Sequence, residues 1–331
     1  MKIFLVISTA LNLLLFPQYA TAEDSLYVLA NTLFGQMPKH MPDSEHDTEK
    51  RIQLGRALYF DTHFSANNTQ SSNSCHNLTD TKTGTENRSV SVGAKGLAGR
   101  RNSPTTWNAG FQFVQFWDGR SPDLVSQAGN PLLNPIEMAL ASKDELVEKL
   151  TEAGYQDLFD AAFPKHDESL TFENTLEALA AFQRTLITRD RFDQYLAGDL
   201  DAINAQEKRG LKSFITVGCN ACHNGPLLGG ELFMKMGLVN PYPNKQDKGR
   251  AEITGNPADN FLFKVPTHRN VAKTAPYFHD GAVFSLEQAV QDTAWHQLGV
   301  TLKPEEVEDI TAFFHTFNNT RNINGVNVNG L

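Results

Sequence analysis

The chain has 331 residues, with 38 acidic and 29 basic side chains and a formal net charge of −9 at pH 7. This length suits one or two domains with a sizeable core, and 20% charged with 10% aromatic residues argues against a chain that is disordered throughout. The acidic balance argues against nucleic-acid binding, since neutralising phosphates needs a surplus of Lys and Arg.

The first segment has the pattern of a secretory signal peptide. Lys2 precedes an apolar run at 3–16, and Pro17 then leads to small residues at 20–22. This pattern predicts cleavage after Ala22 and export, to the periplasm if the host is Gram-negative, with no membrane span left in the mature chain. The alternative is an uncleaved N-terminal anchor, but the apolar run is short for a membrane span.

Helical periodicity dominates the rest of the chain, and the longest strongly helical pattern covers residues 172–187. Further helices are predicted at 48–60, at 142–163 with a break at Gly154, at 286–298 and at 304–316. Long connections rich in Gly, Asn and Pro cover 61–131 and 216–281. No convincing series of alternating strands appears, so we expect a mainly α fold with large ordered loops.

A helix followed by a Cys-His loop occurs twice along the chain. Residues 49–60 precede a loop that carries Cys75-His76, and residues 207–214 precede a loop that carries two further cysteines and His223. Two similar domains are the simplest account of this repeat. The predicted units are a signal peptide at 1–22, an N-terminal domain at 23–187 and a C-terminal domain at 188–331.

The second loop reads Cys219-Asn220-Ala221-Cys222-His223, which is C-x-x-C-H, the attachment signature of c-type haem. Two thiols three positions apart reach the two vinyl groups of one porphyrin, and the next residue, His223, is then placed to bind the iron. The alternatives are a thioredoxin-like redox pair, a disulfide or half a zinc site. However, the chain has only 3 cysteines, so no second pair completes a zinc knuckle, and no βαβ pattern surrounds the motif.

The first loop, residues 71–76, differs from this signature at one position. Ser72 stands where the first Cys of C-x-x-C-H would be, while Cys75 and His76 are present. In the context of the repeat, this pattern predicts a haem held by a single thioether from Cys75, with His76 as iron ligand. The alternatives are a non-covalent haem or an empty site.

Five ordered blocks of the chain resemble the bacterial di-haem cytochrome c peroxidase family, which includes the methylamine-utilisation dihaem oxidases. The blocks are LGRALYFD (54–61), GRRNSPTTWNAGF (99–111), FWDGRSPDLVSQAGNPLLNPIEM (116–138), VGCNACHNGP (217–226) and VPTHRNVAKTAPYFHDGAVFSLEQAV (265–290). The resemblance runs from Leu54 to Phe317. It implies two cytochrome c-like α domains with one haem c each, and a calcium ion between them.

The resemblance also implies roles for residues near the first haem. His76 corresponds to the proximal ligand of the haem at which peroxide reacts, Glu137 to the glutamate that moves protons above that iron, and Gln127 to a residue lining the same pocket. Splitting the O–O bond requires a proton to be taken from one oxygen and given to the other. Without the flanking match, Glu137 would read as a solvated loop carboxylate.

Two further features of the family map between the domains. Trp117 matches the tryptophan that lies between the haems as an electron relay, although a loop Trp by itself is more often a packing anchor. Asn102, with the backbone carbonyls of Thr274 and Pro276, matches the calcium site, and oxygen ligands of this kind suit a hard cation.

Ala94 is a departure from the family at the first haem. Many members have a His in this loop that blocks the resting iron and leaves on reduction. The change to Ala94 therefore predicts a peroxide site that needs no reductive activation.

The second haem shows a departure at its distal side. Thr293 aligns with the distal Met of the family, or the Tyr of the methylamine branch, and Thr is a poor iron ligand. His296, one helical turn later, is the predicted substitute, and the alternative is a half-exposed helix residue. Met234 and Met236 are weaker candidates. Separately, His268 replaces the usual leucine of the family, with no functional account.

These features predict a periplasmic peroxidase that reduces hydrogen peroxide to water. Electrons from a small cytochrome c or a copper protein would enter at the His223 haem, pass near Trp117 and reach the His76 haem. Family members are often dimers, which suggests a homodimer. A second hypothesis is a dihaem oxidase that acts on a protein or peptide side chain. A third is a monohaem electron carrier or redox sensor with an empty N-terminal site, against which the retained Glu137 and Gln127 argue.

Overall fold

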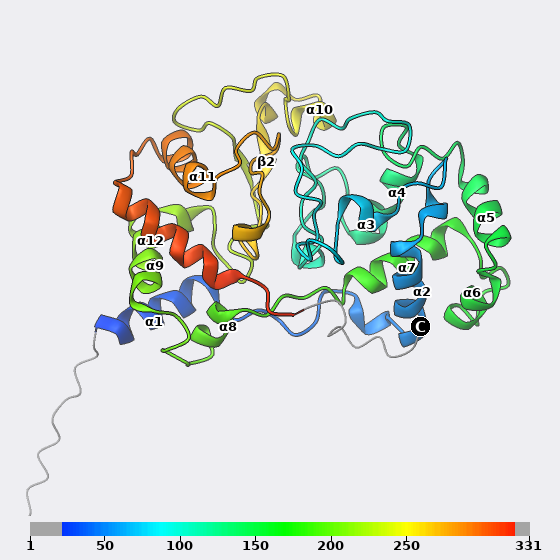
Figure 1. Ribbon diagram of the computed structural model, residues 1–331, viewed down its shortest axis with the longest axis horizontal. Helices are drawn as coiled ribbons and strands as arrows, with labels where there is room; N and C mark the ends of the chain where they lie inside the picture. Colours follow the sequence, from blue (N-terminus) through cyan, green and yellow to red (C-terminus); the bar gives the residue numbers. More distant parts are fainter. Residues whose placement is uncertain (1–21, 322–331) are drawn as a thin grey trace, which may run out of the picture.

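The described part of the chain, residues 22–321 of the computed structural model, forms two groups of helices that lie side by side (Figure 1). We call the group around α2 (Glu49–Phe60) and α7 (Phe172–Gln183) the first lobe. The group around α9 (Ala205–Val217) and α12 (Pro304–Phe314) is the second lobe. The prediction of a mainly α fold is thereby confirmed.

The predicted signal peptide lies outside the described residues, except for Ala22. Across residues 22–321, none of the helices combines the length and the apolar character that a membrane crossing requires.

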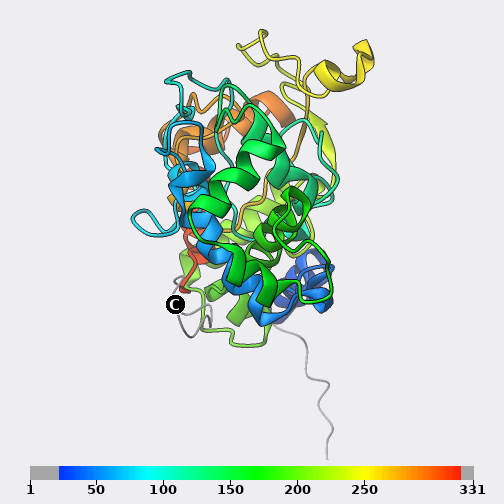
Figure 2. The same cartoon turned by 90° about the vertical axis from the view of Figure 1, so that its right-hand side faces the viewer.

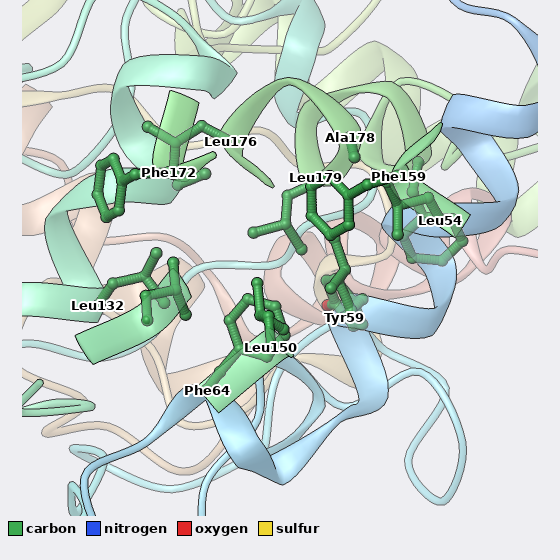
Figure 3. Close-up of a cluster of buried hydrophobic side chains, with 14 of the residues drawn as sticks. Leu54, Tyr59, Phe64, Leu132, Leu150, Phe159, Phe172, Leu176, Ala178 and Leu179 are labelled. Carbon is green, nitrogen blue, oxygen red and sulfur yellow. The ribbon is translucent and has the colours of Figure 1, made fainter. Parts of the chain in front are cut away.

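The core of the first lobe forms where α2 crosses α7 (Figure 3). A Cβ atom at Gly55 would lie 1.7 Å from the carbonyl oxygen of Ala178, so the two helix backbones touch and only glycine fits. Leu54, Leu58 and Phe182 pack beside this crossing. Around it lie α3 (Ser72–Cys75), α4 (Leu124–Leu133), α5 (Lys143–Glu152) and α6 (Gln156–Ala162). The predicted break at Gly154 separates α5 from α6.

The second lobe uses the same device where α9 crosses α12. A Cβ atom at Gly210 would lie 1.9 Å from the carbonyl oxygen of Asp309. Each Cys-His loop therefore follows a helix that is pinned by a glycine against a second helix. The lobe is completed by α8 (Arg191–Leu196), by α11 (Leu286–Thr293) and by one turn of π-helix at Ala294–Leu298.

The first helix of the described chain, α1 (Ala22–Phe34), packs in the core of the second lobe. The ring of Phe34 lies 5.7 Å from that of Phe192 and 6.3 Å from that of Phe214, measured between centroids. The predicted division at residue 187 rests on the order of the two repeats along the chain. It separates α1 from the side chains against which α1 packs.

The long connections contain more regular structure than expected. Residues 124–133, of which most fall in the predicted connection 61–131, form α4, although Gly129 and Pro131 weaken its helical pattern. The Asp123 side chain caps α4 by accepting from the backbone N–H of Ser126, and Leu124, Ala128 and Leu132 are buried. Capping and tertiary packing thus override the local composition.

The connection 216–281 carries a two-stranded antiparallel sheet of β1 (Phe233–Lys235) and β2 (Leu262–Lys264), with Met234 opposite Phe263. It also carries α10 (Ala251–Thr254), whose segment extends away from the rest of the molecule in the side view (Figure 2). Short 3-10 turns lie at Ser44–His46, Thr62–Phe64, Ala109–Phe111, Cys219–Ala221, Pro257–Asp259, Val271–Lys273 and His315–Phe317.

Hydrogen bonds and an ion pair join the two lobes. The backbone N–H of Asn102 donates to the carbonyl of His279 at 2.8 Å, and that of Lys264 donates to the carbonyl of Trp117 at 2.7 Å. The Arg101 guanidinium pairs with Asp247, with 2.6 Å between Nε and Oδ2. The segment 99–118 is therefore held between the lobes.

Candidate functional site

His76 lies at the end of α3, where its ring is oriented by a backbone carbonyl. The His76 Nδ1 atom is 2.9 Å from the carbonyl oxygen of Pro104. Because a carbonyl only accepts, Nδ1 carries the proton and Nε2 keeps its lone pair. Burial lowers the pKa of His76, which favours this neutral form. The hydroxyl of Tyr59 donates to the His76 carbonyl at 2.7 Å and fixes the loop.

The His76 ring lines a cavity of about 440 Å³ in the first lobe. The structure brings Ser72, Cys75, Gln127 and Glu137 to the wall of the same cavity, together with Trp117. Ser72 thus lines the cavity, at the sequence position where a C-x-x-C-H motif has its first cysteine. The predicted residues of the first site are therefore gathered around one space.

Glu137 is half-buried in this cavity and is oriented by its neighbour. The Asn134 Nδ2 atom donates to Glu137 Oε1 at 2.7 Å. Desolvation by burial raises the pKa of Glu137, despite the opposing effects of Asn134 and the Arg120 charge. A carboxyl group with a raised pKa exchanges protons closer to neutral pH than an ordinary glutamate does.

The loop that carries Ala94 packs against the Glu137 segment. The Ala94 N–H donates to the Glu137 carbonyl at 2.7 Å, and Ala94 is buried. From the loop 91–99, the cavity is lined by Ser91, Gly93 and Gly99, whose side chains supply no nitrogen ligand. From this loop, therefore, no nitrogen side chain reaches the cavity, and the need for no reductive activation stays a prediction.

His223 repeats the arrangement of His76 in the second lobe. It follows α9 and the 3-10 turn Cys219–Ala221, and its Nδ1 atom lies 2.8 Å from the carbonyl oxygen of Leu228. Burial lowers the pKa of His223 to about 4, so its ring is neutral with Nε2 unprotonated. Cys219, Cys222 and His223 all line a second cavity of about 230 Å³.

Both cavities pass the same structural test for a c-type haem. In each, a Cys-His pair lies at the wall. The histidine is neutral and its Nδ1 atom donates to a backbone carbonyl, which leaves Nε2 free to bind iron. The second cavity has both thiols of the motif and the first has one. The residues of both sites therefore fit haem.

The structure does not bring His296 to the second cavity. Thr293, Ala294, Gln297 and Leu298 line that cavity, but His296, in the same π-helical turn, does not. The His296 Nδ1 atom lies instead 2.9 Å from the carbonyl oxygen of Asn240. The prediction assumed regular α-helical spacing. The wider π-helical turn instead directs the His296 side chain toward the loop after β1.

Two methionine side chains also line the second cavity. Met234 and Met236 both reach it from β1 and the residue after it. Side chains two positions apart on a strand point to the same face, which explains why both residues share the cavity. The candidates that the sequence ranked lower are therefore the ones at the site.

His268 stacks on His223. Their ring centroids are 3.8 Å apart with 19° between the planes, and the Phe314 ring lies 4.7 Å from His268 on a tilted approach. Buried His268 Nδ1 has no hydrogen-bond partner among the described residues. His268 thus fills the space beside the proximal histidine, a contact that sequence reasoning could not assign.

A wall of shared residues separates the two cavities. Asn102, Gln112, Trp117 and Lys264 line both of them. The indole Nε1 of Trp117 donates to the Asn102 carbonyl at 2.9 Å, which fixes the ring in the wall. Sequence reasoning missed Gln112 and Lys264, and the only available signal was a lysine inside the apolar run Leu262-Phe263-Lys264-Val265.

The residues matched to the calcium site lie at the same boundary. Asn102 lines both cavities, and Thr274 and Pro276 line the second. The Asn102 Nδ2 atom donates to the Arg88 carbonyl at 2.8 Å, which turns the amide so that Oδ1 points the other way. The three residues thus come from both lobes, as a site between two domains requires.

Comparisons with known proteins agree with this geometry. The family model described as "Di-haem cytochrome c peroxidase" matches residues 49–201. The cytochrome c551 peroxidase of Pseudomonas aeruginosa is 41% identical over 92% of this chain and 89% of its own. That of Nitrosomonas europaea is 42% identical over 80% of this chain and 78% of its own.

Among solved structures, the chain is similar to a MauG-like protein associated with microbial copper homeostasis, with a TM-score of 0.77. The two are 30% identical, and the match covers 86% of this chain and 95% of the other. The resemblance seen in the sequence blocks is confirmed over 92% of the chain. The chain therefore belongs to the di-haem cytochrome c peroxidase family.

Proposed function

We propose that this protein is a periplasmic cytochrome c peroxidase that reduces hydrogen peroxide to two water molecules with two electrons and two protons. The observation that carries the proposal is the position of Glu137, whose carboxyl has a raised pKa and lines the same cavity as His76. An acid–base group beside an iron-binding histidine is what cleavage of the O–O bond requires. The cytochrome c551 peroxidases at 41% and 42% identity support the activity.

Haem bound in the two cavities supplies the redox chemistry and the iron at which peroxide reacts. In the first cavity, His76 would hold the iron through Nε2, and the Pro104 carbonyl keeps the ring in the required tautomer. Cys75 would supply the single thioether. Glu137 accepts the proton of one peroxide oxygen and returns it to the other, while Asn134 holds the carboxyl in place.

In the second cavity, Cys219 and Cys222 would attach the haem and His223 would bind its iron. A small cytochrome c or a copper protein would deliver electrons there, and Trp117 would relay them through the wall. Asn102, Thr274 and Pro276 would hold a calcium ion near this wall. Because thioether sulfur raises the potential of a haem iron, the position of Met234 and Met236 favours a higher-potential second haem than ligation by His296 would give.

A second candidate is an oxidase of a protein or peptide side chain, as in the methylamine branch. It is favoured by Ala94 and by the structural similarity to a MauG-like protein. It is disfavoured by Thr293, where that branch has a Tyr.

The test is turnover by the purified holoprotein after its haem is counted by pyridine haemochrome. We expect two haems per chain, one with the α band of a single-thioether haem, and peroxide-dependent oxidation of reduced cytochrome c without prior reduction of the enzyme. Two haems without such turnover would favour the oxidase. One haem with a two-thioether band would mean that the first site is empty and that the protein is an electron carrier or sensor.

A further inference from the structure

Lys264 is a buried lysine in the wall between the two cavities. It is the last residue of β2, its exposed fraction is 5%, and it lines both cavities. Its Nζ atom donates to the side-chain oxygen of Gln112 and, at 3.1 Å, to the carbonyl of Val114. Its backbone N–H donates to the Trp117 carbonyl. The ammonium group is therefore held at the centre of the molecule by neutral oxygens.

No carboxylate of the described residues forms an ion pair with Lys264. The Asp118 charge acts on Lys264, but its carboxylate already accepts from Arg101 at 2.5 Å and from Arg120 at 3.0 Å. Burial removes this group from water and lowers the pKa of Lys264 to about 7, because desolvation disfavours the charged form. A buried cation is normally retained only where an anion pairs with it.

The arginines of the first cavity differ from Lys264 in this respect. Arg101 is paired with Asp118 and Asp247, and Arg100 with Glu252. Their charges are satisfied by the protein. The Lys264 ammonium, by contrast, donates only to the neutral oxygens of Gln112 and Val114, so its charge remains available to a ligand.

The ligand of both cavities is itself an anion at its polar edge. Each haem carries two propionate carboxylates, and a protonated lysine forms short, strong hydrogen bonds with such groups. We propose that the Lys264 ammonium is the common counter-charge for propionates of both haems, in the wall that the two cavities share. This proposal rests on the proposed function, because it requires haem in both cavities.

Such a cation also acts on the two irons. Positive charge near a haem favours the reduced form, whose net charge is less positive, and a water-excluded wall screens the effect weakly. Lys264 therefore raises both reduction potentials together and lies beside Trp117 on the route between the haems. It is a positioning residue, since it acts through the propionates.

The experiment compares the holoprotein with Lys264→Met, which keeps the volume and removes the charge. We expect the equilibrium constant for reduction of each haem to fall on the order of tenfold. For a one-electron couple this equals about 59 mV in each midpoint potential, measured by spectroelectrochemical titration. Haem content by pyridine haemochrome is measured on every variant.

Two variants serve as controls. Lys264→Arg keeps the charge, so we expect both potentials to stay near the wild-type values. Lys235→Met removes an exposed lysine on the neighbouring strand β1, where solvent screens the charge, so we expect little change. If Lys264→Met does not bind haem, Lys264→Gln, which is also neutral, takes its place in the comparison.

The outcomes separate this proposal from the function itself. Unchanged potentials in Lys264→Met, or an equal fall in Lys264→Arg, would overturn the role of the charge. A fall at one haem alone would overturn the sharing between the two. Peroxide turnover by the wild-type protein tests the proposed function independently, since the potentials are measured whether or not peroxide is reduced.

Discussion

The two cavities hold their histidines in the same way but differ in the other side chains that line them. In both, the Nδ1 atom of a histidine is bonded to a backbone carbonyl, at Pro104 for His76 and at Leu228 for His223. The first cavity is larger and carries the Glu137 carboxyl, whereas Met234, Met236 and hydrophobic side chains line the second. Under the proposed function, this difference in lining would assign proton chemistry to the first cavity and electron transfer to the second.

The largest effect is expected from Glu137→Gln, which removes the acid–base group of the first cavity and keeps its shape. We expect kcat/KM for peroxide to fall about 10²–10⁴-fold with haem content unchanged. The base form is needed to accept a proton, so the wild-type rate declines as pH falls through the Glu137 pKa. Because burial raises that pKa, the decline begins at higher pH than for an ordinary glutamate.

The matched control for this variant is Glu148→Gln on α5, which is exposed and lies outside both cavities. It should leave the rate and the pH profile unchanged. An equal loss in both variants, or an unchanged acid limb in Glu137→Gln, would remove Glu137 from the proton chemistry.

The glycines at the two helix crossings test whether the lobes are built alike. Gly55→Ala and Gly210→Ala each place a Cβ within 2 Å of a carbonyl oxygen on the facing helix. Overpacking of this kind costs about 1–3 kcal/mol or more, which would lower the midpoint of denaturant unfolding. Gly154→Ala, which has no atom within 4 Å of its Cβ, reports the strain of a positive φ alone. A tolerated substitution at one crossing would mean that the lobes are not equivalent.

Met234→Leu and Met236→Leu test the distal side of the second haem. If one thioether binds the iron, its variant loses the near-infrared charge-transfer band of thioether-ligated ferric haem, and the potential of that haem falls. His296→Leu is the comparison, because His296 is bonded to Asn240 outside the cavity. Absence of the band from the wild-type protein, with a spectral change in His296→Leu, would restore His296 as the ligand.

The smallest effect is expected from Ser72→Cys, which would make the first motif like the second. The new thiol lies at the cavity wall, so a second thioether should form and shift the haemochrome band to that of an ordinary c-type haem. Turnover should change little, since His76 and Glu137 are untouched. An unshifted band would show that the first haem does not present its free vinyl group to residue 72.

Helices and the attachment motif were predictable because both are local. Residues 172–183 repeat their apolar side chains with the helical period. The helix ends at Gln183, because the next N–H groups, those of Thr185 and Leu186, donate to carbonyls three residues back instead of four. α4 was missed because Gly129 and Pro131 weaken its helical sequence pattern, whereas tertiary packing stabilises the helix. His296 was misplaced because one π-helical turn changed the direction of a single side chain.

The sequence by itself determined the chemistry that covalent spacing encodes. Two cysteines and a histidine within five residues form the attachment motif of a c-type haem wherever the loop lies, and Ser72 predicts that the first site lacks one thioether. Tertiary structure alone decided which distant residues meet. The stack of His268 on His223 joins segments 45 positions apart (268 − 223), and the wall places Lys264 beside Trp117. Such contacts depend on how distant segments of the chain pack together, and the periodicity of the sequence reports only local structure.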